Sequence, residues 1–203
     1  MIKRKNFGSD LLAWYEKNGR DFLWRRKNLT PFQIFLIQMC LKRTKPSAVE
    51  NIAGNILKHI GQIDKIQAKE SNSLEEILSP LGLQAKRSGE IYGLANTLSK
   101  KYSGKVPRDR QLLLQMKGVG PYVADAVLCF AFCEKVVVVD SNVLRVAEKY
   151  FGPIKKTKGG VIREVKSKLE PKIPKGSIKK FNWALIDLGT YLRKPNKQQP
   201  NKD

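Results

Sequence analysis

The stretch LLLQMKGVGPYVADAVLCFAFCEKVVVVDSNVLRV, residues 112–146, combines a tight glycine turn with one isolated aspartate. Gly118 and Gly120 flank Val119, and Asp140 stands twenty residues after the second glycine. Apolar segments on both sides of the glycines predict a helix, a turn and a second helix, because glycine adopts backbone angles that other residues resist. The valine between the glycines can anchor this turn in a core.

A turn of this kind leaves backbone N–H groups at the start of the following helix pointing outward, which suits a phosphate group. Lys117 adds a positive charge directly before the turn. Ordinary helix–helix turns also use glycine, so the GVG sequence by itself leaves a purely structural turn as open as a phosphate site.

Asp140 follows the apolar segment KVVVVD and precedes SNVLRVAEKY, which reads as a helix. Local sequence therefore favours an N-cap role for the aspartate. A cap aspartate that faces a cleft remains a usable carboxylate, so a structural and a chemical role are compatible. The four valines favour a strand, but no other segment is patterned as its partner, and a short buried connector is predicted.

The composition points to a compact protein with a polyanionic partner. The 203 residues include 41% apolar side chains, enough for one or two domains with a core. Lys and Arg number 39 against 18 Asp and Glu, a net charge of +21. This excess most simply indicates a phosphate backbone, with solubility or attraction to a membrane surface as alternatives.

The chain shows no apolar run long enough to span a bilayer and no apolar region typical of a signal peptide. A cytoplasmic, nucleoid-associated location is therefore expected, with no membrane partner. The three cysteines lie in apolar stretches and are expected to be reduced and structural. Helical patterns cover most of the chain, and Thr30-Pro31 predicts the start of a strongly apolar central helix.

Six segments follow one another along the chain in a recognisable order: GRDFLWRR, LIQMCLKRT, LGLQAKRSGEI, VPRDRQLLLQMKGVGPYVADAVLCFAF, VVVVDSNVLRV and FNWALIDLG. Together they resemble the helix-hairpin-helix DNA glycosylase superfamily, which includes endonuclease III, adenine glycosylases of A·G mismatches and mismatch thymine glycosylases. The similarity runs from about residue 19 to about residue 189. It implies an all-α fold of two lobes with a DNA-binding cleft between them.

The resemblance also implies a division of the chain. A six-helix module at 29–142 would carry the hairpin, and 1–28 plus 143–203 would form a discontinuous second lobe with a flexible tail at 194–203. The partner would be double-stranded DNA with a mismatched or damaged base, flipped out of the stack for the reaction. The enzyme is expected to be a monomer.

Three residues receive catalytic roles from the resemblance. Asp140 matches the essential aspartate, which stabilises the sugar as it becomes cationic and can orient the attacking water. Asn142 matches a position whose amide could orient this acid or the sugar. Tyr122 stands where bifunctional members carry a nucleophilic lysine, and a phenol cannot form a Schiff base. A monofunctional enzyme is predicted, with a packed aromatic as the alternative role of Tyr122.

Further segments match parts of the family that contact DNA. They are the hairpin (Lys117, Gly118, Val119, Gly120), the segment that probes the duplex (Lys42, Arg43), the opposite wedge (Leu83) and a WR pair lining the interlobe cleft (Trp24, Arg25). Apolar wedges of this kind separate stacked bases. An ordinary core position is the alternative for Leu83.

The sequence departs from many relatives at its C-terminal end. Those relatives hold an iron–sulfur cluster with four cysteines, whereas DLGTYLRKPNKQQPNKD contains none, and Leu192 occupies the position of the first ligand. No cofactor, no iron–sulfur cluster and no metal site is therefore expected. A monovalent cation at the hairpin is the one ion that the resemblance allows.

A second departure concerns the base. Adenine-removing members and many thymine-removing members carry glutamate at the position of Gln38, and that acid protonates the purine in the adenine enzymes. Glutamine cannot donate a proton readily, but its amide N–H₂ can polarise a pyrimidine carbonyl. The prediction is base excision of thymine or uracil opposite guanine. An adenine or modified-base glycosylase and a non-catalytic binder of distorted DNA are the alternatives, and Asp140 argues against the binder.

Overall fold

The computed structural model describes residues 2–26, 28–67, 71–155 and 160–193, and within these ranges the only regular elements are helices. The all-α class predicted from the sequence is confirmed. The predicted tail at 194–203 lies outside the described residues. No helix in the ranges described is both long enough and apolar enough to cross a bilayer.

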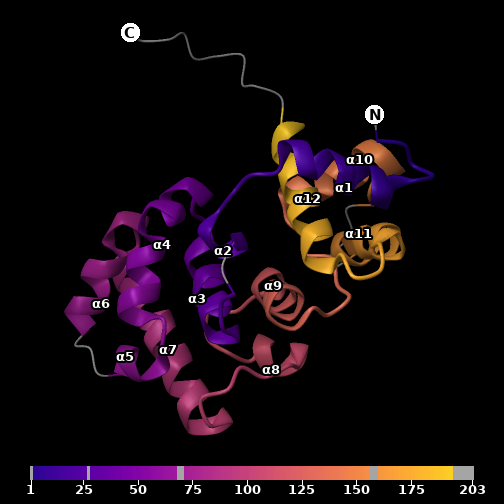
Figure 1. Ribbon diagram of the computed structural model, residues 1–203. Coiled ribbons are helices and arrows are strands. Elements are labelled where there is room, and N and C mark those ends of the chain that lie inside the picture. Colours follow the sequence, from indigo (N-terminus) through magenta and orange to yellow (C-terminus); the bar gives the residue numbers. More distant parts are fainter. Residues whose placement is uncertain (1, 27, 68–70, 156–159, 194–203) are drawn as a thin grey trace, which may run out of the picture. The chain divides into compact units, whose positions relative to one another are not determined.

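The elements follow in the order α1 (Phe7–Asn18), α2 (Leu23–Arg26), α3 (Pro31–Leu41), α4 (Pro46–Ile60), α5 (Ile63–Gln67), α6 (Ser71–Leu78), η1 (Ser79–Leu81), α7 (Gln84–Tyr102), α8 (Arg110–Leu114), α9 (Pro121–Phe132), α10 (Ser141–Phe151), α11 (Gly160–Leu169), η2 (Glu170–Lys172) and α12 (Ile178–Tyr191). Figure 1 labels the α-helices, α1 to α12.

The chain divides into two compact units. The first unit joins Met1–Arg20 to Val137–Asp203, and the second is Asp21–Val136. These boundaries differ from the predicted ones at 29 and 142. The N–H of Leu23 donates to both carboxylate oxygens of Glu50, at 3.1 and 2.9 Å, which ties α2 to α4 in the second unit.

α12 is the central helix of the first unit and packs against both α1 and α10 (Figure 1). The ring of Phe7 lies edge-on to Phe151 and Phe181, with centroids 5.0 and 6.3 Å apart. Arg20 fastens the segment after α1 to α12, because its Nη2 lies 2.7 Å from the carboxylate of Asp187. Helices from the two ends of this unit thus share one core.

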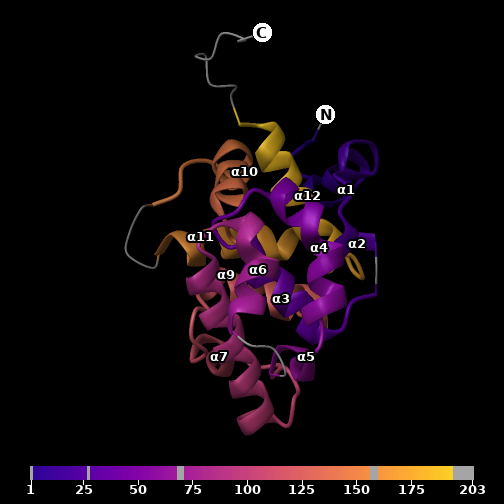
Figure 2. The same ribbon diagram turned by 90° about the vertical axis from the view of Figure 1, so that its left-hand side faces the viewer.

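α3 is the central helix of the second unit, where it packs against α4, α7 and α9 (Figures 1 and 2). It begins where Thr30-Pro31 predicts. The N–H of Gln33 donates to the Thr30 hydroxyl at 3.3 Å, and the Gln33 side chain accepts from the Thr30 N–H at 3.0 Å. This capping box satisfies two backbone donors at once. Buried side chains then surround most of the helix.

The valine-rich connector before Asp140 forms no strand in the described chain. Val137 and Val138 are buried, and side chains satisfy their N–H groups. Val137 donates to the Glu170 carboxylate at 3.3 Å, and Val138 donates to the Asn182 amide oxygen at 2.8 Å. The buried connector is confirmed: side-chain acceptors take the place of a partner strand.

Candidate active site and DNA-contacting loops

The hairpin consists of α8, a turn and α9. Asp109 caps α8, since its carboxylate accepts from the N–H of Leu112 at 2.9 Å. Arg110 of α8 then joins the buried Asp125 of α9, with 2.7 Å between Nε and Oδ1. The predicted helix, turn and helix are confirmed, and an ion pair holds the two helices together.

The turn itself needs glycine at its first position. Gly118 has φ +82°, in the left-handed region, and a Cβ at this position would lie 2.8 Å from the carboxyl carbon of Glu90. Val119 is buried, and its N–H donates to the carbonyl of Met116 at 3.1 Å. Gly120 is the N-cap of α9 and has no side chain to cover the first N–H groups of that helix. The start of α9 thus suits an anion.

Asp140 is the N-cap of α10, as local sequence predicts. Its Oδ1 accepts from the N–H groups of Asn142 and Val143 at 2.9 and 2.8 Å. Its Oδ2 accepts from the side-chain amide of Asn142 at 2.8 Å. The side chain is only half-buried. Three hydrogen bonds therefore fix the direction of the carboxylate in a residue that is not fully buried.

A second layer of contacts positions Asn142. Its Oδ1 accepts from Arg145 at 3.0 Å, and the same guanidinium nitrogen donates to the carbonyl of Gly189 at 2.7 Å. A Cβ on Gly189 would lie 2.2 Å from the carbonyl oxygen of Asn142. Only glycine lets α12 come this close to α10. Sequence reasoning assigned no role to Arg145 or Gly189, although Gly189 ends the quoted segment FNWALIDLG.

Gln38 lies on α3 and only 4% of it is exposed. Its amide oxygen is buried, and no group within the described part of the chain donates a hydrogen bond to it. A buried acceptor without a partner costs about 1–3 kcal/mol. An unpaired acceptor of this kind suits a site that binds a ligand with a hydrogen-bond donor.

Lys42 follows α3 and is engaged inside the second unit. Its Nζ lies 2.5 Å from the carboxylate of Glu90 and 3.1 Å from the carbonyl oxygen of Gly118. Sequence reasoning placed Lys42 on DNA and did not single out Glu90, which belongs to α7, 48 residues away. No local pattern could have revealed this long-range pair.

Arg43 and Leu83 are non-glycine residues with left-handed backbones, at φ 59° and 54°. Leu83 precedes α7 and is 61% exposed, so the alternative of a core position is wrong. Left-handed angles cost a non-glycine residue about 1–2 kcal/mol. Strain of this kind persists where surrounding contacts enforce it, and it is common at functional sites.

The enforcing contacts come from Arg87 on the first turns of α7, which is 5% exposed. Its guanidinium donates to the carbonyls of Gly82 and Lys42 at 2.9 and 3.0 Å, and to the hydroxyl of Thr44 at 2.5 Å. It also reaches the carbonyls of Met39 and Cys40 at 3.3 and 3.2 Å. One side chain thus joins the loop of Arg43 to the loop of Leu83.

The remaining predicted positions lie in the second unit. Tyr122 is the second residue of α9 and packs, half-buried, against the core of that unit. Trp24 stacks on Phe22 with centroids 4.6 Å apart, and the guanidinium of Arg25 lies 5.0 Å from the same Phe22 ring. Lys117 is exposed beside the hairpin turn.

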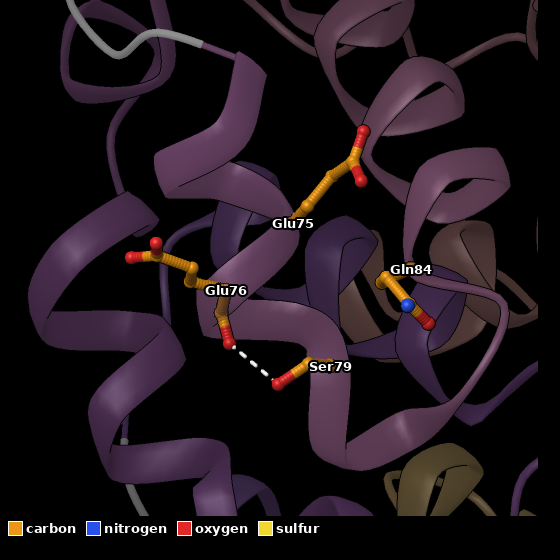
Figure 3. Close-up of a pocket in the computed structure, with 4 residues that line it drawn as sticks. All are labelled: Glu75, Glu76, Ser79 and Gln84. Atoms are coloured by element: carbon orange, nitrogen blue, oxygen red, sulfur yellow. Dashed lines mark hydrogen bonds between the residues drawn. The ribbon is translucent and has the colours of Figure 1, made fainter.

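A pocket elsewhere on the second unit is lined by Glu75, Glu76, Ser79 and Gln84 (Figure 3). The Ser79 hydroxyl donates to the backbone carbonyl of Glu76 at 2.9 Å. None of the predicted site residues lines this pocket. Its two carboxylates disfavour a phosphate group, so it does not compete with the hairpin as a DNA contact.

Metal ligands do not gather anywhere in the ranges described: no group of three or more His, Cys, Asp and Glu side chains could hold a metal ion there. Cys40 and Cys129 are buried, and Cys133 is exposed. Burial raises the pKa of the Cys40 thiol to about 12, although the nearby Arg87 charge acts in the opposite direction. That thiol is therefore inert at neutral pH.

Comparison with known proteins identifies the class of enzyme. No family model matches the chain. The thymine/uracil-DNA glycosylase of Methanothermobacter thermautotrophicus is 30% identical over 200 residues, which cover 98% of this chain and 90% of that protein. The chain belongs to the helix-hairpin-helix DNA glycosylases. The enzyme class predicted from the sequence is confirmed, and the alternative of a non-catalytic binder is wrong.

Three further proteins are similar to this chain. The thymine-DNA glycosylase of Aeropyrum pernix is 26% identical over 194 residues, covering 91% of this chain and 86% of that protein. The solved structure of a thermostable thymine-DNA glycosylase superposes with a TM-score of 0.85 at 29% identity, covering 96% and 89%. A non-covalent endonuclease III–DNA complex shares the fold, with a TM-score of 0.78 at 22% identity, covering 97% and 91%.

Proposed function

We propose that this DNA glycosylase removes thymine or uracil mispaired with guanine, by hydrolysis and without a covalent protein–DNA intermediate. The observation that carries the proposal is the Asp140 carboxylate, half-buried and held by three hydrogen bonds at the N-terminus of α10. The names of the thymine- and uracil-removing relatives support the choice of pyrimidine.

Asp140 supplies the charge that the reaction needs. As the N-glycosidic bond breaks, the base takes the bonding electrons and positive charge develops on the sugar. A carboxylate that is already oriented stabilises this charge without further rearrangement, and such stabilisation lowers a barrier by about 3–4 kcal/mol. Water then adds to the sugar carbon and loses a proton, and the departing base takes up a proton, which leaves an abasic site and the free base. Asn142 and Arg145 act through Asp140 as positioning residues.

Tyr122 makes the enzyme monofunctional. A bifunctional glycosylase uses a lysine amine as nucleophile and forms a Schiff base, and the phenol of Tyr122 cannot do so. Lys117, the nearest lysine in the chain, precedes the hairpin turn rather than following it. Strand cleavage that depends on an amine is therefore absent from the proposed reaction.

Gln38 recognises the base. Its buried amide oxygen, which accepts no hydrogen bond within the described chain, suits the ring N–H of thymine or uracil, and its N–H₂ group suits the adjacent carbonyl. A ligand that completes these bonds removes the cost of the orphaned acceptor. Adenine is disfavoured, because glutamine cannot supply the proton that makes a purine leave.

The partner is duplex DNA, bound by a monomer, and no iron–sulfur cluster takes part. The chain contains three cysteines and none after Cys133, whereas a cluster held by thiolates needs four. Leu192 stands at the position of the first ligand and packs against the core of the first unit, so apolar packing supports this end of α12 instead. A monovalent cation at the hairpin remains compatible with the proposal.

A panel of duplexes tests the proposal. Each duplex carries one G·T, G·U, A·G, A·8-oxoguanine or undamaged pair, and strand breaks are developed with and without hot alkali. Breaks at G·T or G·U that require alkali are expected. Activity on A·G alone would move the substrate to adenine, and a protein–DNA adduct trapped by borohydride would overturn the role of Tyr122. The strand breaks are quantified with enzyme in excess over DNA, so that neither binding nor product release limits the observed rate of excision.

A further inference from the structure

We propose that Lys42 and Glu90 are positioning residues that hold the hairpin for DNA, and that Lys42 does not bind phosphate itself. The inference rests on the proposed role of the hairpin in binding DNA, but it does not depend on which base is removed. It assigns a role to Glu90, a buried acid in a protein whose partner is a polyanion.

The contact geometry shows a brace between three elements of the second unit. Lys42 follows α3, Glu90 lies on α7, and Gly118 belongs to the hairpin turn. The ammonium group of Lys42 lies between the other two, 2.5 Å from the carboxylate and 3.1 Å from the Gly118 carbonyl oxygen. Because this carbonyl is held, the peptide groups of the turn cannot rotate freely.

Glu90 also limits the turn sterically. The Glu90 side chain is only 10% exposed. A Cβ on Gly118 would lie 2.8 Å from the carboxyl carbon of Glu90, so any larger residue in place of this glycine would collide with the acid. The left-handed glycine therefore fits against the acid as well as adopting the required angle. Charge pairing and close packing act on the same residue of the turn.

The same face of α7 holds the other DNA-contacting loops. Arg87 lies one turn before Glu90. It donates to the carbonyls of Cys40 and Lys42, which precede Arg43, and to the carbonyl of Gly82, which precedes Leu83. The two side chains together connect the start of α7 to the three loops that the family resemblance predicts to contact DNA: the hairpin turn, the loop of Arg43 and the loop of Leu83. A shift of either contact would move these loops relative to one another.

The alternative is that Lys42 binds a phosphate, and the two roles predict opposite effects of Glu90. A carboxylate beside a phosphate-binding lysine repels DNA, so its removal would tighten binding. A carboxylate that orients the hairpin helps binding, so its removal would weaken binding although the protein becomes more positive. The sign of the change therefore separates the two roles.

The test measures binding of undamaged duplex between 50 and 200 mM salt by wild type, Glu90→Gln, Lys42→Gln and the double variant. Each single variant is expected to bind several-fold more weakly, with an unchanged slope of log affinity against log salt. The double variant is expected to lose no more affinity than the weaker-binding single variant, because both substitutions break the same contact. If Lys42 bound a phosphate, Lys42→Gln would instead reduce the magnitude of this slope by about 1.

Two control variants calibrate the measurement. Glu76→Gln removes a carboxylate from the exposed rim of the pocket in Figure 3 and is expected to change affinity less than about twofold. Lys117→Gln, at the exposed hairpin lysine, is expected to lower the slope by about 1. Circular dichroism and thermal melting check that each variant is folded.

Tighter binding by Glu90→Gln, or a lower slope for Lys42→Gln, overturns the inference. If the Glu90 variant does not fold, Lys42→Gln still decides between the roles, since the Lys42 side chain is 28% exposed and its loss leaves no large cavity. The choice of base is tested separately by the mismatch panel, so failure of one proposal is distinguishable from failure of the other.

Discussion

Asp140 closes the first turn of α10 and also supplies the carboxylate of the proposed reaction, and two substitutions can separate these roles. Asp140→Asn keeps an acceptor oxygen, and asparagine is as good an N-cap as aspartate. We expect excision to fall about 10²–10³-fold while most of the stability is kept. Asp140→Ala is expected to lose the same activity and a further ~1 kcal/mol of unfolding free energy.

Single-turnover excision and urea denaturation measure the two effects for both variants. The roles would be inseparable if Asp140→Asn lost as much stability as Asp140→Ala. The catalytic role would be wrong if Asp140→Asn excised the base at the wild-type rate.

Leu83 is exposed and strained, which predicts a trade of activity against stability. Leu83→Gly relieves the left-handed backbone, so the unfolding free energy is expected to stay equal or rise by up to about 1 kcal/mol. Excision from a mismatch is expected to fall about tenfold or more, because the wedge is lost. Leu83→Ala is the matched control: it loses the wedge but keeps the strain. Wild-type excision by Leu83→Gly would exclude the wedge role.

Cys40 makes the stability of the second unit depend on alkaline pH. Burial raises the pKa of its thiol from 9.0 to about 12, so the folded protein keeps a proton that the unfolded chain loses within this window. The unfolding free energy is therefore unaffected below pH 9 and falls above it, by about 1.4 kcal/mol per pH unit from this group. Urea denaturation at pH 8, 9 and 10 is expected to show a smaller decline for Cys40→Ser. Identical declines would contradict the assignment.

At the scale of elements, local signals were sufficient where one short segment decides the structure. The Thr30-Pro31 start of α3, the glycine hairpin and the cap at Asp140 all follow from neighbouring residues. Contacts between distant segments were not predictable, because no periodicity links Lys42 to Glu90. The valine connector lies between these cases. Its composition favours a strand, but its conformation depends on hydrogen-bond acceptors from distant parts of the chain.

Arg87 explains how α7 supports two strained loops, and its removal should be costly. Arg87→Met leaves several buried carbonyl groups without donors, at about 1–3 kcal/mol for each that water cannot reach. We expect a loss of at least ~3 kcal/mol in unfolding free energy, measured by denaturant titration. Arg87→Lys keeps the charge but not the planar fork, so it is expected to recover only part of this loss.

Lys86→Met provides the matched control for Arg87, because the neighbouring side chain on α7 is exposed. Its unfolding free energy is expected to change by less than about 0.5 kcal/mol. An equal loss in the Lys86 and Arg87 variants would show that helix propensity, and not the buried hydrogen bonds, stabilises this region.

For the whole molecule, net charge and family resemblance carried the prediction further than any local pattern. Charge alone left a membrane surface as an alternative to nucleic acid, and membership of the glycosylases removes that ambiguity. The residues that surround the base depend on three-dimensional packing, so Gln38 could be named from the sequence while its buried, unpartnered oxygen could not.

Basic side chains outnumber acidic ones in both units, so the electrostatic contribution to DNA binding should be distributed over the whole protein. We expect affinity for an undamaged duplex to fall about 10³-fold between 50 and 200 mM salt, as for proteins that neutralise six or more phosphates. Single-turnover excision with all mismatched DNA bound should hardly change over this range, because screening acts on association and not on the pre-oriented carboxylate at Asp140. Fluorescence anisotropy and quenched-flow measurements at matched salt separate the two. A fall in affinity of less than tenfold would mean that most of the +21 charge lies away from the bound duplex.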